Sequence, residues 1–251
     1  MAKHMSKSKP WHNPPNDPEY YEWLKNKKVN KLLRLIASTG ASAVMQVLYG
    51  RLKIEVPQAT TDYDGRAVFS PAHRSGWDIP ATVAAIARAG FERPRPVSKD
   101  GNFPNRPVSW LMHNLGAGAV NREHPKISGI ESAFGNFLEH DENLKVYSEG
   151  TRIKEDARRV RKIAGTALLL AAQHSNTAVI AMGCAGLAQE DSKRPIGFGA
   201  PIVITFSEPL HVPLADTHRE SLKTASVLRP QLQDMMQAAL DRAYELRDAY
   251  L

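Results

Sequence analysis

Residues 66–90 read RAVFSPAHRSGWDIPATVAAIARAG: a short β-rich run, a polar turn, and a segment of helical composition closed by Gly90. Branched and aromatic residues favour strands, and a glycine directly after an apolar periodic segment is typical of a helix end. The stretch therefore predicts a strand at 66–70, a loop, and a helix at 79–89, in that order. The loop, which carries His73 and Asp78, would leave the carboxyl end of the strand.

The same alternation continues on both sides of this unit. Further strands are predicted at 51–56, near Val97, and at 144–147, 177–182 and 201–206, and further helices at 108–115, 127–140, 165–174 and 220–248. Strands that alternate with helices are typical of a mostly parallel sheet covered on both faces. We therefore expect an α/β domain over residues 51–251, with a mostly parallel central sheet flanked by helices. Sites in such sheets form where loops leave the carboxyl ends of strands.

The N-terminal fifth of the chain has a different composition. Residues 1–17 are polar with three prolines and predict a flexible tail, and Pro18 after Asn16 and Asp17 predicts a helix start. Residues 18–50 combine a basic, tryptophan-bearing helix with a less charged one. The charge-free run from 35 to 50 falls short of the roughly 20 apolar residues that span a bilayer. We predict a helical membrane-associating segment at the interface; packing of its apolar residues on the domain is the alternative.

Charge and cysteine content restrict the partners and the compartment. The chain has 33 Lys and Arg against 26 Asp and Glu, a net charge of +7, which favours nucleic acid, an anionic membrane face or phosphorylated substrates. The single cysteine, Cys184, excludes an internal disulfide and fits a reducing compartment. The N-terminus lacks the pattern of a signal peptide, so we expect a cytoplasmic site of action.

A histidine and an aspartate five positions apart are the first candidates for chemistry. Three pairs have this H-x4-D spacing: His12/Asp17, His73/Asp78 and His211/Asp216. The first lies in the predicted tail, and the last lies in a proline-containing connector where a surface pair is expected. Only His73/Asp78 follows a predicted strand and precedes a predicted helix.

The residue types of this pair suit proton transfer. A histidine can take the proton of an attacking hydroxyl near neutral pH, and a carboxylate bonded to its other ring nitrogen would fix the tautomer. Contact between residues five apart requires a bent backbone, which Ser75 and Gly76 would supply. The chain has no G-x-S-x-G elbow, so Ser75 is expected to be a turn hydroxyl, and a serine esterase is the less favoured alternative.

A second polar group follows another predicted strand. Residues 147–152, YSEGTR, combine a carboxylate, a glycine, a hydroxyl and an arginine, a set that can cradle a phosphate. The alternative is a polar turn in which Glu149 pairs with Arg152. The basic run TRIKEDARRVRKIAG at 151–165 would extend the phosphate surface, with Lys162 as its best candidate, or would be a solvated face.

Taken together, these motifs resemble a known family. HRSGWD, GAGAVNR and YSEGTR occur in the order and at the approximate spacing of the motifs of glycerophospholipid acyltransferases of the 1-acylglycerol-3-phosphate acyltransferase type, and RKIAGTALLLA and ITFSEPL are similar to its later motifs. The resemblance implies an acyltransferase that uses acyl-CoA or acyl-carrier protein as donor substrate, with no bound cofactor or metal. It implies His73 as general base, Asp78 as its partner, and acceptor-phosphate or packing roles for Arg122, Glu149, Gly150, Thr151 and Arg152.

The sequence departs from the family pattern at Ala72, where asparagine is usual, and at Tyr147 and Ser148, where phenylalanine and proline are usual. We expect transfer of a fatty acyl chain to the hydroxyl of a lysophospholipid or glycerol-phosphate-like acceptor, without an acyl-enzyme, at the inner face of the membrane. The alternatives are a non-glycerolipid alcohol or amine acceptor, and a non-enzymatic protein that binds an anionic surface or nucleic acid. Nucleic acid is not an expected partner because no groove-reading helix, zinc-knuckle spacing or aromatic strand motif is present.

Overall fold

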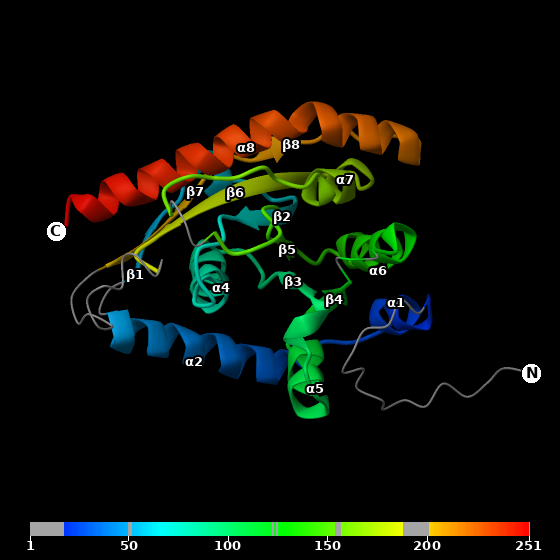
Figure 1. Ribbon diagram of the computed structural model, residues 1–251, viewed down its shortest axis with the longest axis horizontal. Coiled ribbons are helices and arrows are strands. Elements are labelled where there is room, and N and C mark those ends of the chain that lie inside the picture. The colour runs from blue at the N-terminus through cyan, green and yellow to red at the C-terminus, as the bar shows by residue number, and fades with distance from the viewer. Residues whose placement is uncertain are drawn as a thin grey trace, which may run out of the picture.

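A central sheet with helices on both faces forms the body of the protein (Figure 1). The computed structural model describes residues 18–49, 52–121, 123, 125–153, 157–187 and 201–250. The predicted tail at 1–17, with the His12/Asp17 pair and the proposed caps Asn16 and Asp17, lies outside these residues.

The strands of the described residues form one sheet in the order β1-β7-β6-β2-β5-β3-β4. Neighbours are parallel throughout this path except for β6 and β7, and the short β8 pairs antiparallel with β6. The prediction of an α/β fold with a mostly parallel sheet is confirmed. The bounds are β1 Leu52–Glu55, β2 Arg66–Pro71, β3 Arg95–Lys99, β4 Gly118–Val120, β5 Leu144–Val146, β6 Thr177–Ala185, β7 Ile202–Phe206 and β8 Leu210–His211.

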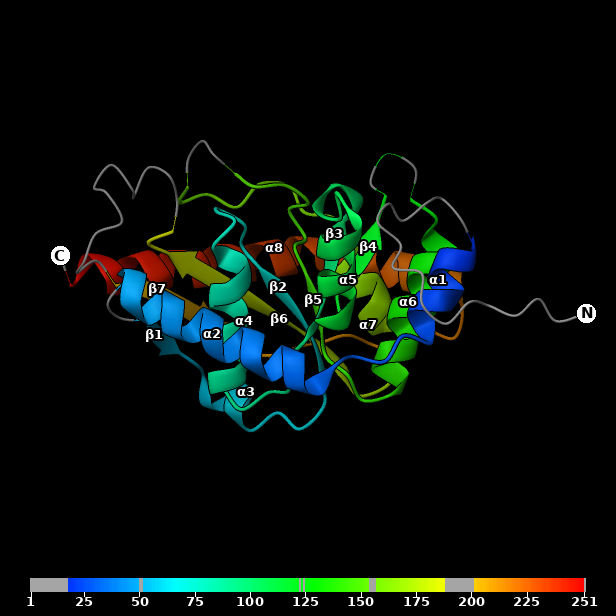
Figure 2. The same ribbon diagram turned by 90° about the horizontal axis from the view of Figure 1, so that it is seen from below.

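Helices α7 and α8 cover one face of the sheet, and α4 with α2 lies on the other, as Figure 2 shows from below. Helices α1 and α6 pack together near the β4 end of the sheet. The bounds are α1 Pro18–Lys25, α2 Lys31–Tyr49, α3 Gln58–Thr61, α4 Asp78–Arg88, α5 Arg106–Asn114, α6 Ile127–Glu139, α7 Thr166–Ala172 and α8 His218–Asp248, with a 3-10 turn at Asp100–Asn102.

Two hydrophobic clusters fill the two faces, and the period-two alternation of strand side chains divides the sequence between them. In β2, Val68 packs into the cluster under α7 and α8, whereas Ala67 and Phe69 pack into the cluster under α4. All nine residues of β6 are buried. A strand buried on both faces reads as a continuous apolar run, which is why TAVIAM was recognisable in the sequence.

The predicted membrane-associating segment consists of two helices separated by residues 26–30. Helix α1 packs on the domain: Tyr20, Tyr21 and Leu24 are buried, and Gly129 of α6 has no side chain where the Tyr21 ring lies. For α1, the packing alternative therefore describes the structure. On α2, by contrast, Leu32, Leu35 and Ile36 are exposed. No helix among the described residues is long and apolar enough to cross a bilayer.

Candidate active site

The two polar motifs come together because their strands are neighbours. Strand β2 leads to His73 and strand β5 leads to Glu149, and the two strands pair in parallel with Val68 opposite Leu144. Parallel strands place their carboxyl ends at the same edge of a sheet, so both loops start from one edge. The backbone joins them directly, because Ile153 N donates to His73 O at 2.9 Å.

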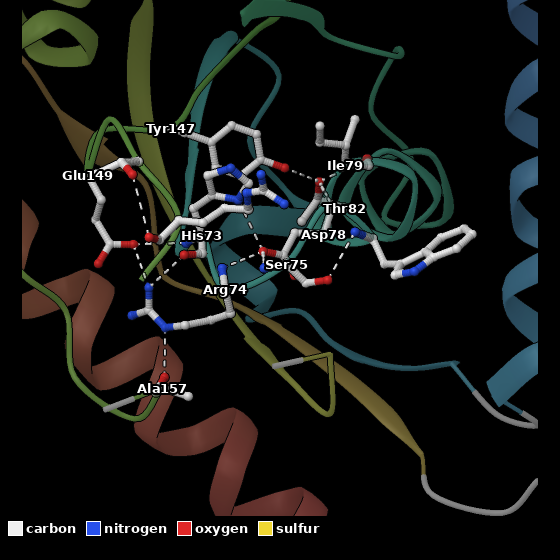
Figure 3. A network of polar contacts seen from close by, with 12 residues as sticks. His73, Arg74, Ser75, Asp78, Ile79, Thr82, Tyr147, Glu149 and Ala157 are labelled. Carbon is white, nitrogen blue, oxygen red and sulfur yellow. Dashed lines mark hydrogen bonds and ion pairs between the residues drawn. The ribbon is translucent and has the colours of Figure 1, made fainter. Parts of the chain in front are cut away.

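His73 contacts Asp78 within the loop between β2 and α4. Nδ1 of His73 lies 3.2 Å from Oδ2 of Asp78, and the carboxyl side chain is fully buried while the imidazole is 13% exposed (Figure 3). The same Oδ2 accepts hydrogen bonds from the backbone N of Arg74 and, at 2.6 Å, of Ser75. Asp78 is the first residue of α4, where the helix dipole favours a carboxylate. The bent loop thus wraps its amide groups around the carboxylate that faces the histidine.

The hydroxyl of Ser75 takes part in the same turn. Its Oγ accepts a hydrogen bond from the backbone N of Trp77 at 3.2 Å. This is the arrangement expected of a turn hydroxyl, and the contact helps to hold the bend through Gly76 that brings Asp78 back toward His73.

Glu149 is a buried residue that holds the loop after β2 in place through hydrogen bonds. Its side chain is fully buried, and Oε2 accepts from His73 N at 2.8 Å and from Nη1 of Arg74 at 2.7 Å, while Oε1 accepts from Arg161 N at 3.1 Å. Arg74 continues the connection by donating to the carbonyl of Ala157. The ion pair of Glu149 is therefore with Arg74, not with Arg152 as the polar-turn alternative supposed.

The other predicted binding residues lie nearer to solvent. Gly150 has a φ of +72°, a conformation that favours glycine, and it lines the cavity described below. Thr151, Arg152 and Lys162 are exposed, and Nη1 of Arg152 lies 3.9 Å from the position that a Cβ on Gly76 would occupy. Arg122 lies outside the described residues. The phosphate-binding roles of these residues stay predictions.

A cavity of about 410 Å³ opens beside His73. Its walls are largely apolar, and one polar stretch of the lining consists of Ser98, Lys99 and Asn102. A cavity with mostly apolar walls and a few polar groups is typical of a small-molecule site. The apolar lining includes Ile79, Val97, Met112, Val120, Ile130 and Val146.

Tyr147 is a site residue for which the sequence predicted no role of its own. Its ring stacks on the imidazole of His73 with centroids 4.1 Å apart and planes at 29°, and its hydroxyl lies 3.5 Å from that of Thr82 (Figure 3). Burial raises the pKa of this phenol well above its usual value. The signal available in the sequence was an aromatic residue at the end of a buried strand.

Lys145 was missed as well. Its side chain is fully buried in β5 and reaches α4, and burial lowers its pKa to about 7 although nearby Asp78 acts in the opposite direction. A lysine in the middle of the apolar run NLKVY was the signal, since a charged residue in a buried strand requires an explanation.

Among the described residues, no cluster of three or more His, Cys, Asp or Glu side chains could hold a metal ion.

Comparisons with known proteins bear on the family and the fold. The sequence model of the Acyltransferase family matches residues 51–190, more than half of the chain, and this range contains both motif loops. No curated protein gives a significant match. Among solved structures, the chain is similar to the 1-acyl-sn-glycerophosphate (LPA) acyltransferase PlsC from Thermotoga maritima, with a TM-score of 0.53 and 15% identity over 80% of this chain and 78% of that one. At this level of identity, the structural match shows a shared fold.

Proposed function

The chain belongs to the acyltransferase family, and from that premise we propose that it transfers a fatty acyl chain from acyl-CoA to the hydroxyl of a lysophospholipid or glycerol-phosphate-like acceptor. One observation carries the proposal. His73 has Nδ1 against a buried carboxylate, and its ring lines an apolar cavity of about 410 Å³. A base held between an orienting acid and a compartment for a hydrocarbon chain is what this reaction requires.

The proposed reaction is a direct transfer. With Nδ1–H donated to Asp78, Nε2 of His73 takes the proton of the acceptor hydroxyl while that oxygen attacks the thioester carbonyl. The C–S bond breaks, coenzyme A leaves as a thiolate, and the proton on His73 passes to that thiolate or to solvent. Asp78 stabilises the imidazolium during this step, so neither an acyl-enzyme nor a metal is needed.

The headgroup of the acceptor is the second part of the proposal. We assign it to the exposed cations near the loop edge, Arg152 and Lys162, with Gly150 and the Thr151 hydroxyl beside them, and on the sequence motif alone to Arg122. Arginine and backbone N–H groups suit a phosphate. Glu149 has the packing role, because its two oxygens are occupied by Arg74 and by backbone amides. Lys99, which lines the cavity, is a further cation within the same compartment.

We also propose that the enzyme works as a peripheral protein on the inner, cytoplasmic face of the membrane, where its lipid acceptor lies. The exposed Leu32, Leu35 and Ile36 of α2 follow the basic residues at 25–31, a combination that binds anionic lipid surfaces. Acyl-carrier protein is the alternative acyl donor to acyl-CoA. As an acidic protein, it would bind the same basic residues at 25–31.

The function is tested by measuring thiol release from palmitoyl-CoA with a panel of acceptors, and by identifying the product by mass spectrometry. The panel contains lysophosphatidic acid, glycerol 3-phosphate, a monoacylglycerol without phosphate, and a long-chain amine. We expect an acylated product only with a phosphorylated acceptor. Turnover with the amine alone would mean that the acceptor is an amine and not a phosphorylated alcohol. If none of the four acceptors gives an acylated product, the proposal is contradicted.

The headgroup assignment has its own test. Arg152→Ala is expected to raise the KM for a phosphorylated acceptor about tenfold with little change in kcat, because the lost ion pair binds substrate and transition state alike. Arg219→Ala, which removes an exposed arginine from the start of α8, is the matched control and should leave KM unchanged. A fall in kcat at constant KM for Arg152→Ala would contradict the assignment.

A further inference from the structure

Lys145 is a buried cation that the proposed reaction does not use. It stands in the centre of β5, opposite Phe69 of β2 and Pro96 of β3, and none of its surface is exposed. Burying an ammonium group is costly unless polar groups and a counter-charge compensate it. The position therefore needs an explanation in terms of its neighbours.

The contacts of Lys145 lead to the helix turn that carries the catalytic acid. Its Nζ donates to Ile79 O at 3.1 Å and to Thr82 Oγ1 at 3.2 Å. Thr82 Oγ1 in turn donates to the carbonyl of Asp78 at 2.6 Å. The lysine thus connects β5 to the first turn of α4, one residue beyond Asp78.

The charges around this turn associate Lys145 with Asp78. Glu149 is neutralised by Arg74, so Asp78 is the remaining buried carboxylate beside His73. Oδ2 of Asp78 has three donors, whereas Oδ1 is buried and has no hydrogen-bond partner among the described residues. Asp78 raises the pKa of the Lys145 ammonium against the larger effect of burial, so the two charges attract each other across the turn.

We propose that Lys145 is a positioning residue for the His73–Asp78 pair, which holds the first turn of α4 in place and offsets the charge of Asp78. This inference rests on the proposed function, because it concerns how the base is tuned. A carboxylate with no counter-charge would favour the protonated form of the base and leave less of the neutral imidazole that takes the acceptor proton. With the ammonium nearby, Asp78 still fixes the tautomer but favours the protonated form less.

The neighbouring groups do not duplicate this role. The titratable groups that face Lys145 are Asp78 on α4 and Tyr147, the residue after β5, with His73 beyond the carboxylate. The phenol of Tyr147 stays neutral because burial raises its pKa, and the Glu149 carboxylate is paired with Arg74. Lys145 is then the group placed to balance Asp78 below about pH 7, where its amine is protonated.

Lys145→Met tests the inference, because it keeps the length of the side chain and removes its charge. We expect the acidic limb of the pH profile of kcat/KM to move upward by about one pH unit in Lys145→Met. An acidic limb at the wild-type pH would overturn the charge-offset role.

A double-mutant cycle measures the same coupling without turnover. Lys145→Met alone should lower the Tm by roughly 10 °C, because it leaves the Asp78 carboxylate uncompensated. In the Asp78→Asn background the same substitution should lower the Tm by far less, since no charge is left to balance. Equal losses in the two backgrounds would overturn the proposal.

Two further comparisons complete the test. Arg95→Met removes another buried cation, one paired with Glu142 just before β5, and should destabilise the fold without moving the acidic limb of the pH profile. If Lys145→Met does not fold, Lys145→Met with Asp78→Asn should; failure of both would mean that Lys145 is needed regardless of Asp78 and would overturn the proposal. Because the unfolding measurements need no substrate, their result stands apart from whether the wild-type protein transfers acyl chains.

Discussion

Two of the three pairs with the H-x4-D spacing lie among the described residues, yet the structure gives them different surroundings. His73 and Asp78 leave β2, in the middle of the sheet, and Nδ1 lies 3.2 Å from a fully buried carboxylate. His211 is the last residue of β8 and Asp216 follows that strand; both are exposed, and the ring of His211 packs against Tyr63. The H-x4-D spacing alone therefore does not bring the histidine and the aspartate into contact. The path of the backbone between them decides whether they meet.

The backbone amide groups account for the difference. In the first segment, the N–H groups of Arg74 and Ser75 converge on the carboxylate of Asp78 and turn it toward His73. In the second, the N–H of Asp216 donates to the carboxylate of Glu220, which belongs to the capping box at the start of α8. Both segments lead into a helix, but only in the first do the backbone amide groups orient the aspartate toward the histidine of its pair.

The largest effect is expected when the acid of each pair is neutralised. Asp78→Asn should lower kcat roughly 10³-fold, because an amide can no longer hold the tautomer or stabilise the imidazolium. Asp216→Asn should leave kcat unchanged. Both rates are measured by thiol release from acyl-CoA with a saturating acceptor. A loss of less than tenfold in Asp78→Asn would remove the distinction between the segments.

The next effect separates the two glutamates that support the segments. Glu149→Gln should lower the free energy of unfolding by about 4 kcal/mol, because it leaves the buried Arg74 guanidinium without its counter-charge. Glu220→Gln should change it by about 0.5 kcal/mol or less, since glutamine can also close a capping box. Urea denaturation of the two variants measures the difference. Equal losses would mean that the Arg74–Glu149 pair adds no stability to the site.

A smaller effect concerns a third histidine, His113, which is buried with both ring nitrogens hydrogen-bonded. Nε2 of His113 lies 3.0 Å from the Tyr20 hydroxyl and Nδ1 lies 3.3 Å from that of Ser109. Burial lowers its pKa from 6.5 to about 4, so the unfolded chain binds a proton at a pH where the folded protein does not. Its contribution to stability is complete above pH 6.5 and is lost as the pH falls toward 4.

We therefore expect the free energy of unfolding to fall by about 2 kcal/mol more between pH 7.5 and pH 5 in the wild type than in His113→Gln. His140→Gln, at an exposed histidine, is the control and should keep the wild-type dependence on pH. Identical pH dependence in wild type and His113→Gln would show that the buried histidine is protonated without penalty.

The sequence predicted the fold well where its signals are local and repeated. The apolar run of β6 and the alternation of strands with helices give the parallel sheet, and the helix predicted at 79–89 differs from α4 by one residue at each end. The three-residue β4 was missed because Gly118 weakens a strand signal. Its glycine reflects a distant contact, since the side chains of Phe134 and Leu24 occupy the space of a Cβ.

The site could be predicted only in part, because contacts between residues distant in the chain complete it. The motifs place His73, Asp78 and Glu149 in loops at one edge of the sheet. That Glu149 pairs with Arg74, however, and that Tyr147 stacks on His73, depends on the parallel pairing of β2 with β5. Lys145 stood in the sequence as an isolated charge in an apolar strand, and its partner, the first turn of α4, lies 66 residues away from it in the chain.

The comparison of the two segments is tested most directly by the rate of thiol release in His73→Ala and His211→Ala, measured side by side with palmitoyl-CoA and lysophosphatidic acid. We expect a loss of at least roughly 10³-fold for His73→Ala at unchanged Tm, and wild-type turnover for His211→Ala. Retained turnover in His73→Ala, or an equal loss in both variants, would contradict the assignment of His73 as the general base.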